Sequence, residues 1–144
     1  MENPKEYNHY PNKIAHLQMI QGVIDRMGGN LFYLRGWVIS LAAGGLVLLT
    51  QLEDGGRLPI IFLGLITLLF WAYDGYFLSL ERNYRKLYDK VRMMDENEVN
   101  FSMNIRDFKR DWDSSILACI FSPTLRFFYS PLLFAILYVI FFIK

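Results

Sequence analysis

Two oppositely charged side chains stand inside stretches of the sequence that are otherwise apolar. Asp74 lies within the apolar run 58–80, and Arg35 directly precedes an earlier apolar run. A charge in a membrane-spanning segment is costly, so by default it marks a partner or a functional site. If the two runs fold as antiparallel helices about Gly55, the two charges lie at nearly equal distances from the turn. They then predict either an ion pair that locks a hairpin, which we favour, or a polar ring that lines the pore of an oligomer.

The same register suggests a second pair further from the turn. Asp25 and Arg85 are equally distant from Gly55 along the chain. We therefore expect the two helices to remain packed against each other beyond the apolar runs, with an ion pair between these two residues.

Basic and aromatic residues alternate directly after the second apolar run. Arg82, Tyr84, Arg85 and Lys86 follow one another closely there. Such residues can grip phosphates and stack on bases, which makes them candidates for binding an anionic ligand. The commoner explanation is a basic cluster next to the membrane that contacts anionic headgroups.

Small residues recur every fourth position in the first apolar run. Gly36, Ser40 and Gly44 would form one face of a helix on which another helix backbone can approach closely. The spacing indicates a helix-packing face, and it leaves open whether the partner is the chain's own hairpin or another subunit.

The sequence lacks a recognisable set of catalytic residues. The sequence contains neither the motif of a metalloprotease nor a glycine-rich phosphate loop, and its one cysteine, Cys119, adjoins an apolar run. His16 is expected on the surface of an amphipathic helix. We therefore predict no catalytic residues, no metal site and no cofactor, and we expect that the protein is not an enzyme.

The composition favours a membrane protein. Of the 144 residues, 53% are hydrophobic and 17% are aromatic. A soluble domain of this size buries too small a fraction of its surface to hide so many apolar side chains. We therefore predict an all-α membrane protein, built on a helical hairpin of two transmembrane helices with helical extensions into the cytosol.

The apolar periodicity places the elements of the first two thirds of the chain. A flexible tail is expected over 1–12, followed by an amphipathic helix that starts at Lys13 with Asn12 as its N-cap. Paired glycines, Gly28 and Gly29, predict a bend because together they cost about 2 kcal/mol in a helix interior. The first span is expected over 36–52, a turn over 53–57, and a second span over 58–80 that continues as a cytosolic stalk to about Met94. Residues 13–94 then form one unit.

The last third, residues 95–144, is expected to be a cytosolic loop followed by a C-terminal apolar segment. Residues 95–111 are polar, with a short helix expected from Ile105, and 116–121 is a short apolar stretch. The uncharged run 127–143 is just long enough to cross a bilayer. We favour a third transmembrane helix over a re-entrant segment, although Pro131 lies near the start of this run.

Lysine and arginine residues predict the orientation. They are concentrated before the first span and between the second and third segments, while the turn between the first two spans holds only Arg57. Because such residues accumulate on the cytosolic side, we expect the N-terminus and the central region in the cytoplasm and the turn outside.

Two stretches resemble a known group of proteins. One is residues 16–27 (HLQMIQGVIDRM), followed by Asn30, Phe32 and Gly36-Trp37, and the other is residues 74–92 with the pattern DGYFL, ER, R, LYD and VR. Together they are similar to small bacterial membrane proteins that occur in anti-phage defence loci, among them the membrane effector of the Hailong system. The resemblance covers about residues 13–92 and does not extend to the remaining C-terminal part.

The resemblance implies a homo-oligomeric effector, for example a tetramer. Such a protein would lie in the inner membrane of a bacterium and would open an ion-conducting path, or otherwise breach that membrane, in response to a nucleotide or oligonucleotide signal. A nucleotidyltransferase-like partner would make that signal. The alternative that we carry forward is a non-conducting membrane scaffold or accessory subunit, which holds a cytosolic partner at the lipid bilayer.

Overall fold

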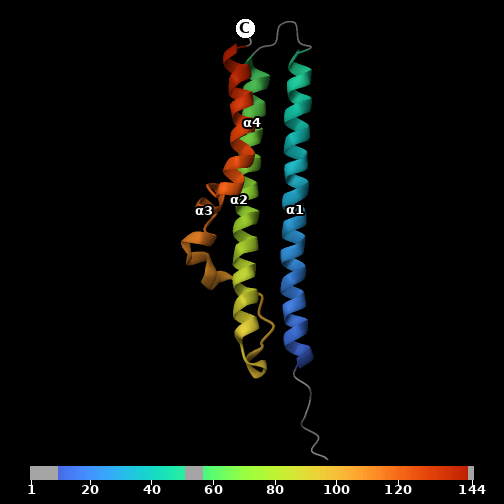
Figure 1. Cartoon of the computed structure of the whole chain (residues 1–144), viewed down its shortest axis with the longest axis vertical. Coiled ribbons are helices and arrows are strands. Elements are labelled where there is room, and N and C mark those ends of the chain that lie inside the picture. Colours follow the sequence, from blue (N-terminus) through green and yellow to red (C-terminus); the bar gives the residue numbers. More distant parts are fainter. Residues whose placement is uncertain (1–9, 51–56, 143–144) are drawn as a thin grey trace, which may run out of the picture.

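The computed structural model describes residues 10–50 and 57–142 and contains only helices and loops in these ranges (Figure 1). The three long helices are α1 (Tyr10–Thr50), α2 (Arg57–Met93) and α4 (Pro123–Phe142). Between α2 and α4 lie the 3-10 turns η1 (Glu96–Glu98), η2 (Arg106–Arg110) and η3 (Trp112–Ser114), and a short helix, α3 (Ile116–Ile120). The predicted all-α class with a third long C-terminal helix is confirmed.

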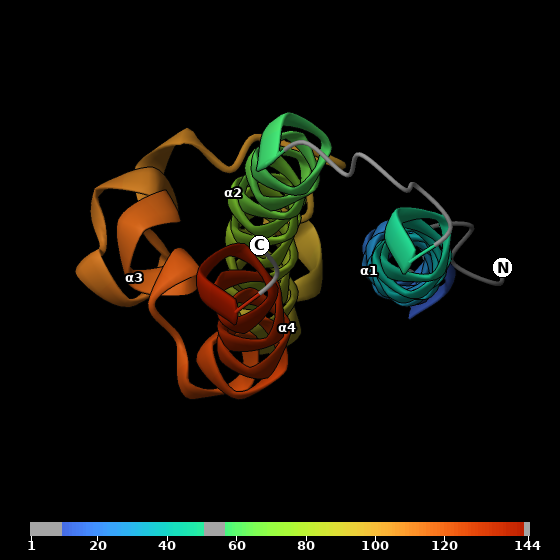
Figure 2. The same ribbon diagram turned by 90° about the horizontal axis from the view of Figure 1, so that it is seen from above.

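The long helices form an open antiparallel arrangement. The chain runs along α1, returns along α2, and then turns back so that α4 ends near the point where α1 ends (Figure 1). Seen along the bundle, α1 and α3 lie on opposite sides of α2, and α4 packs beside α2 (Figure 2).

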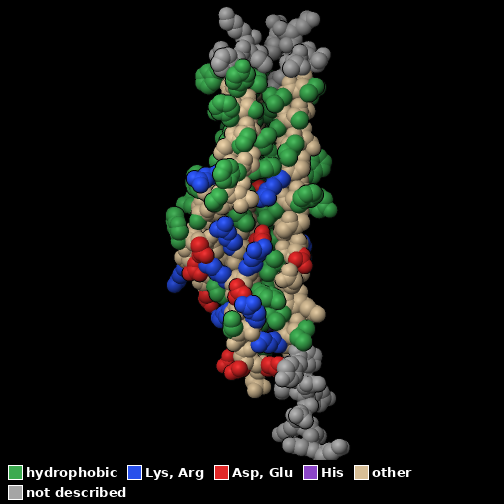
Figure 3. Space-filling model, in the orientation of Figure 1, with side chains coloured by type: hydrophobic (Ala, Val, Ile, Leu, Met, Phe, Trp, Pro, Cys, Tyr) green, Lys and Arg blue, Asp and Glu red, His purple; other side chains and the backbone are tan. Residues whose placement is uncertain are grey.

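Within the described ranges, three helical stretches are long and apolar enough to cross a membrane: Asn12–Leu48, Leu58–Met93 and Pro123–Phe141. Large apolar side chains such as Leu69 and Phe134 are mostly exposed on them. The space-filling view shows these side chains toward one end and the charged side chains toward the other (Figure 3). We call residues 36–50, 57–77 and 123–142 the apolar half, and residues 10–35 and 78–122 the polar half. Such a surface is that of a membrane protein.

The polar half has a packed core of its own. Ile20 and Ile24 of α1 are buried against Leu87 and Val91 of α2, and Ile105 of the following loop closes the cluster. The apolar stripe on α1 that the periodicity predicts therefore faces α2, as expected for two amphipathic helices.

The predicted bend at Gly28 and Gly29 is wrong, because α1 is one continuous helix through both residues. The turns on either side are fixed by burial of Ile24 and Leu31. Tertiary packing of this kind overrides the modest cost of glycine in a helix. The helix also begins earlier than predicted, at Tyr10, so that Asn12 is inside it and Pro11 occupies its first turn, where proline is tolerated.

The second and third spans begin and end close to the predicted residues. α2 continues without a break to Met93, and η2 matches the short helix expected from Ile105. α4 passes through Pro131 and starts four residues before the predicted span, at Pro123, and it is long and apolar enough to cross a membrane. Residues 1–9 of the tail predicted over 1–12 lie outside the described residues, as do residues 51–56, which include the end of the first predicted span and most of the turn, and residues 143–144.

Candidate functional site

The two charges of the apolar runs meet. Arg35 donates from Nε to Oδ2 of Asp74 at 2.9 Å and from one terminal nitrogen to Oδ1 at 3.2 Å. The Asp74 side chain is fully buried, whereas the Arg35 side chain is 27% exposed. The two-point contact is the geometry in which guanidinium and carboxylate bind most strongly. The ion pair predicted from the hairpin register is therefore present within one chain.

A third helix joins this pair through a residue that the sequence reasoning missed. The hydroxyl of Tyr129, in α4, donates to Oδ2 of Asp74 at 3.3 Å, and Tyr129 is fully buried. Its ring stacks on Trp71 with 5.6 Å between ring centroids, and the neighbouring Phe128 ring lies 5.7 Å from the Arg35 guanidinium. Arg35, Asp74 and Tyr129, which we call the polar node, thus tie α1, α2 and α4 together.

The partners of Asp74 decide what the polar node can do. Both carboxylate oxygens are engaged by groups of the same chain, and the side chain has no exposed surface. A carboxylate in this state has no face left for a passing ion. This geometry fits the interpretation of Arg35 and Asp74 as a lock better than their interpretation as a pore lining.

Close beneath the polar node, α3 is pressed against α2 at a glycine. A Cβ added to Gly75 would meet the Cγ1 atom of Ile120 and would lie 3.0 Å from the Ile120 Cα. The indole nitrogen of Trp71 donates to the Ile120 carbonyl at 2.9 Å. Only glycine allows this approach, so the Asp74-Gly75 pair holds α1 and α4 with one residue and α3 with the next.

Polar side chains of α2 hold the segment that leads into α3. Ser79 donates to the Ser114 carbonyl at 2.6 Å, and Arg82 donates to the Asp113 carbonyl at 2.6 Å. Lys86 reaches the carboxylates of both Asp111 and Asp113, at 2.8 and 2.6 Å. The hydrogen bond from Lys86 lowers the pKa of the Asp113 carboxyl. These contacts form a clasp between α2 and residues 111–114.

The four residues expected to bind an anionic ligand do not converge. Arg82 and Lys86 belong to the clasp, whereas Tyr84 packs against the core of the polar half and Arg85 pairs with Glu81 at 2.6 Å. Arg82 and Lys86 are four residues apart and share one face of α2, whereas Tyr84 is two residues from each of them and points in another direction. In this state of the molecule the two cations of the clasp already contact carboxylate or carbonyl oxygens.

Two further expectations for the polar half are wrong. Asp25 accepts a hydrogen bond from Gln21 and Arg85 pairs with Glu81, so the second ion pair between the helices is not formed. His16 is buried rather than exposed, and its Nε2 lies 3.2 Å from the Ser102 carbonyl because the loop after α2 folds back over α1. Cys119 is buried, as expected for a packed apolar residue, and burial raises the pKa of its thiol.

The small-residue face of α1 is open. Gly36, Ser40 and Gly44 are exposed, and nothing lies within 4 Å of a Cβ built on either glycine. Within the chain's own hairpin, the neighbouring Gly45 makes the contact between α1 and α2 instead, because a Cβ built on it would lie 3.1 Å from Leu63.

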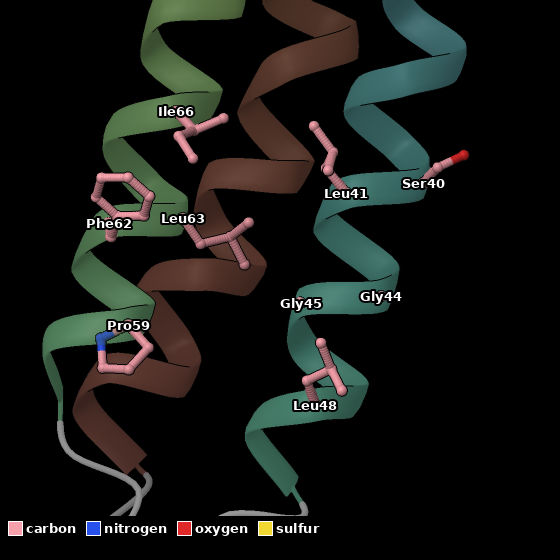
Figure 4. Close-up of a pocket in the computed structure, with 9 residues that line it drawn as sticks. All are labelled: Ser40, Leu41, Gly44, Gly45, Leu48, Pro59, Phe62, Leu63 and Ile66. Atoms are coloured by element: carbon pink, nitrogen blue, oxygen red, sulfur yellow. The ribbon is translucent and has the colours of Figure 1, made fainter.

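An apolar groove lies beside that face, between α1 and α2. It has a volume of about 500 Å³ (Figure 4), and its lining residues are Ser40, Leu41, Gly44, Gly45, Leu48, Pro59, Phe62, Leu63 and Ile66. Two of the three residues of the predicted packing face thus line a groove that the single chain leaves unfilled.

Groups that could hold a metal ion are absent from the part of the chain that the structure describes. Comparison of the chain with protein-family models, with curated proteins and with solved structures gives no match. The fold and the site define the chain as a membrane protein whose described residues include three apolar helices long enough to span a bilayer.

Proposed function

We propose that the protein is an oligomeric membrane effector, which changes the ion permeability of a bacterial inner membrane when its cytosolic half receives a nucleotide, an oligonucleotide or a partner protein. In this proposal the polar half is cytosolic, as the distribution of Lys and Arg favours. The resemblance of residues 13–92 to membrane proteins of anti-phage defence loci supports the same class. No catalytic step is part of the proposal.

The observation that carries the proposal is the continuity of α1 and α2. Each helix runs unbroken from the packed core of the polar half into the apolar half. A helix without a hinge transmits a displacement at one end to the other, so a ligand that repacks the polar half would move the spans. The polar node lies where the two halves meet, and it fixes the positions of α1, α2 and α4 relative to one another.

The open face on α1 supplies the means of assembly. Three spans of one chain enclose no continuous path, and in lipid close packing of small residues is what drives helices together. Gly36, Ser40 and Gly44 are available to a second copy because this chain does not cover them.

A non-conducting scaffold is the second candidate, and the polar node favours it. Asp74 and Arg35 neutralise each other inside one chain, so this pair offers no unpaired charge to line a path. Such a protein would use its spans only to hold a cytosolic partner at the bilayer.

Ion flux from liposomes distinguishes the two candidates. Full-length protein is reconstituted with a trapped potassium-sensitive dye, with and without lysate of cells that carry its genomic neighbours. The effector releases potassium under one of these conditions, and Gly36→Leu or Gly44→Leu abolishes the release by blocking close helix approach. Gly22→Leu is the matched control, because Gly22 is an equally open glycine of α1 in the polar half. Intact vesicles under every condition contradict the effector and leave the scaffold.

A further inference from the structure

The segment between α2 and α4 carries an apolar surface outside the three spans. Trp112, Leu117 and Phe121 are exposed by 74, 60 and 62%, and Ile116 is also exposed. We call residues 112–122 the elbow. It projects from the side of α2 that is opposite to α1 (Figure 2). Large apolar side chains concentrated in so short a segment indicate an interaction surface.

The elbow is fixed in place rather than loosely attached. Ile120 is pressed against Gly75, and its carbonyl accepts the hydrogen bond from Trp71. Upstream of α3, the Ser114 carbonyl accepts from Ser79, and Ser114 is buried. The exposed apolar side chains are therefore held outward by a built structure, and their exposure is not the result of an unpacked loop.

The attachment points place the elbow at a membrane boundary. A helix rises 1.5 Å per residue, so Gly75 lies about 26 Å and Ser79 about 32 Å along α2 from Leu58. The hydrocarbon core of a bilayer is about 30 Å thick, so a boundary drawn from Leu58 falls between these two residues. α3, which contacts Gly75, is then just inside the apolar layer, and the clasp is just outside it.

Aromatic residues of the other helices lie at the same level. Tyr33 and Trp37 of α1 and Tyr73 and Tyr76 of α2 are exposed there. Tyrosine and tryptophan gather at the level of lipid headgroups because one part of each ring system is apolar and another is polar. Trp112 of the elbow extends this belt around the molecule.

Basic side chains flank the elbow and have no partner of opposite charge in the described part of the chain. Lys109 and Arg126 are exposed, and neither forms an ion pair there. Lys109 also lines a recess of about 260 Å³ together with Tyr76 and Leu117. Free cations beside apolar side chains at a membrane boundary match a phospholipid, which offers a phosphate next to its acyl chains.

We propose that the elbow is an interfacial membrane anchor, which inserts Leu117 and its apolar neighbours into the headgroup layer and binds anionic phospholipid through Lys109 and Arg126. The anchor sets the depth of the bundle in the bilayer. It extends beyond the function proposed above, since both an effector and a scaffold could use it.

Depth-dependent quenching tests insertion. The full-length chain with Cys119→Ala receives one fluorescent label through Leu117→Cys, Leu69→Cys or Asn97→Cys, and is reconstituted in phosphatidylcholine–phosphatidylglycerol vesicles that contain nitroxide-labelled lipids. The anchor predicts that the Leu117→Cys label is quenched most by a shallow nitroxide and the Leu69→Cys label by a deep one, while the Asn97→Cys label in η1 is barely quenched. An unquenched Leu117→Cys label beside a quenched Leu69→Cys label places the elbow outside the lipid, free for a protein partner, and overturns the proposal. A Leu69→Cys label that no nitroxide quenches would show that α2 does not enter the bilayer. That result also overturns the proposal, because the anchor requires a bundle inserted in the membrane.

Headgroup preference tests the charges. Energy transfer from the Leu117→Cys label to acceptor-labelled phosphatidylglycerol should exceed that to acceptor-labelled phosphatidylcholine several-fold at low salt, since each basic residue near an anionic surface contributes about a fivefold preference. Lys109→Gln with Arg126→Gln should remove most of this excess. Arg92→Gln, which changes a charge at the distant end of α2, should leave it unchanged. Equal transfer to both lipids in the unsubstituted chain contradicts the anionic-lipid site.

Discussion

The two halves of the molecule are held together in different ways. In the polar half, α1 and α2 share a core of five buried apolar residues, closed by Ile105 of the loop. In the apolar half the same two helices leave a groove of about 500 Å³ between them, and the polar node connects them at its edge. Apolar side chains associate in water because burial removes their surface from it. This hydrophobic effect therefore stabilises the core of the polar half. In lipid that force is absent, and specific polar contacts and close backbone packing take its place.

The largest effect is expected from breaking the polar node on one side. Asp74→Ala leaves the Arg35 guanidinium without its partner next to the apolar half, which should destabilise the bundle by about 3–5 kcal/mol. Thermal unfolding of the purified protein in detergent measures this loss. Asp74→Leu combined with Arg35→Leu removes both charges and should cost much less than either change alone. A double variant as unstable as the single ones would contradict the account of the node as a compensated pair.

The next effect concerns the glycine under α3. Gly75→Ala drives a methyl group into Ile120 and should cost about 1–3 kcal/mol, because both the α2 and α3 backbones would have to shift. Gly28→Ala is the matched control, since nothing lies within 4 Å of its Cβ and α1 is helical there. That change should leave stability unaltered or raise it by up to about 1 kcal/mol. Equal behaviour of the two variants would show that α3 does not dock tightly on α2.

A smaller effect isolates the contribution of α4 to the node. Tyr129→Phe removes the hydroxyl that donates to Asp74 while it preserves the stacking on Trp71. One hydrogen bond to a charged group contributes about 1.5–3 kcal/mol, and the 3.3 Å distance places this one at the weak end. The loss should disappear in the background that lacks both charges of the node. A loss that persists in that background would assign the role of Tyr129 to packing alone.

The smallest effect belongs to the solvent-exposed clasp, and it depends on pH. Because Lys86 lowers the pKa of the Asp113 carboxyl, this contact stabilises the folded protein above the ordinary carboxyl pKa. The contribution is lost as the pH falls through the lowered pKa and Asp113 becomes protonated. Hydrogen exchange of residues 111–114 should therefore quicken in acid, and Lys86→Gln should make it fast already at neutral pH. Exchange in these four residues that does not respond to Lys86→Gln would contradict the clasp.

The contrast between the halves also explains what the sequence could predict. The common level of Arg35 and Asp74 follows from counting residues about one turn, because the register of two antiparallel helices sets which residues lie at the same depth. Tyr129 could not be placed in this way, since a loop of irregular structure separates α4 from α2. The sequence signal for Tyr129 is its place among phenylalanines in a span. A buried tyrosine hydroxyl needs a hydrogen-bond partner, so such a tyrosine indicates a polar contact.

Tertiary packing explains the remaining wrong predictions and also the dispersal of the basic cluster, whose role in ligand binding stays a prediction. Propensity predicts a bend at Gly28, but burial of the neighbouring turns keeps α1 continuous. His16 was expected on the surface, because nothing in its own helix reveals that the loop after α2 returns to cover it. The basic cluster at 82–86 is contiguous in sequence but divided among several faces of α2, one of which is covered by a segment about thirty residues away. Local sequence predicts where helices run, and it does not predict what covers them.

The most direct test of the proposed effector is the membrane potential of bacteria that express the full chain together with its genomic neighbours, recorded with a voltage-sensitive dye during phage challenge. The account predicts depolarisation on challenge, which disappears with Gly36→Leu or Gly44→Leu and persists with Gly22→Leu. A membrane potential that stays constant throughout, with the protein shown by fractionation to be in the membrane, would contradict the effector and leave the scaffold.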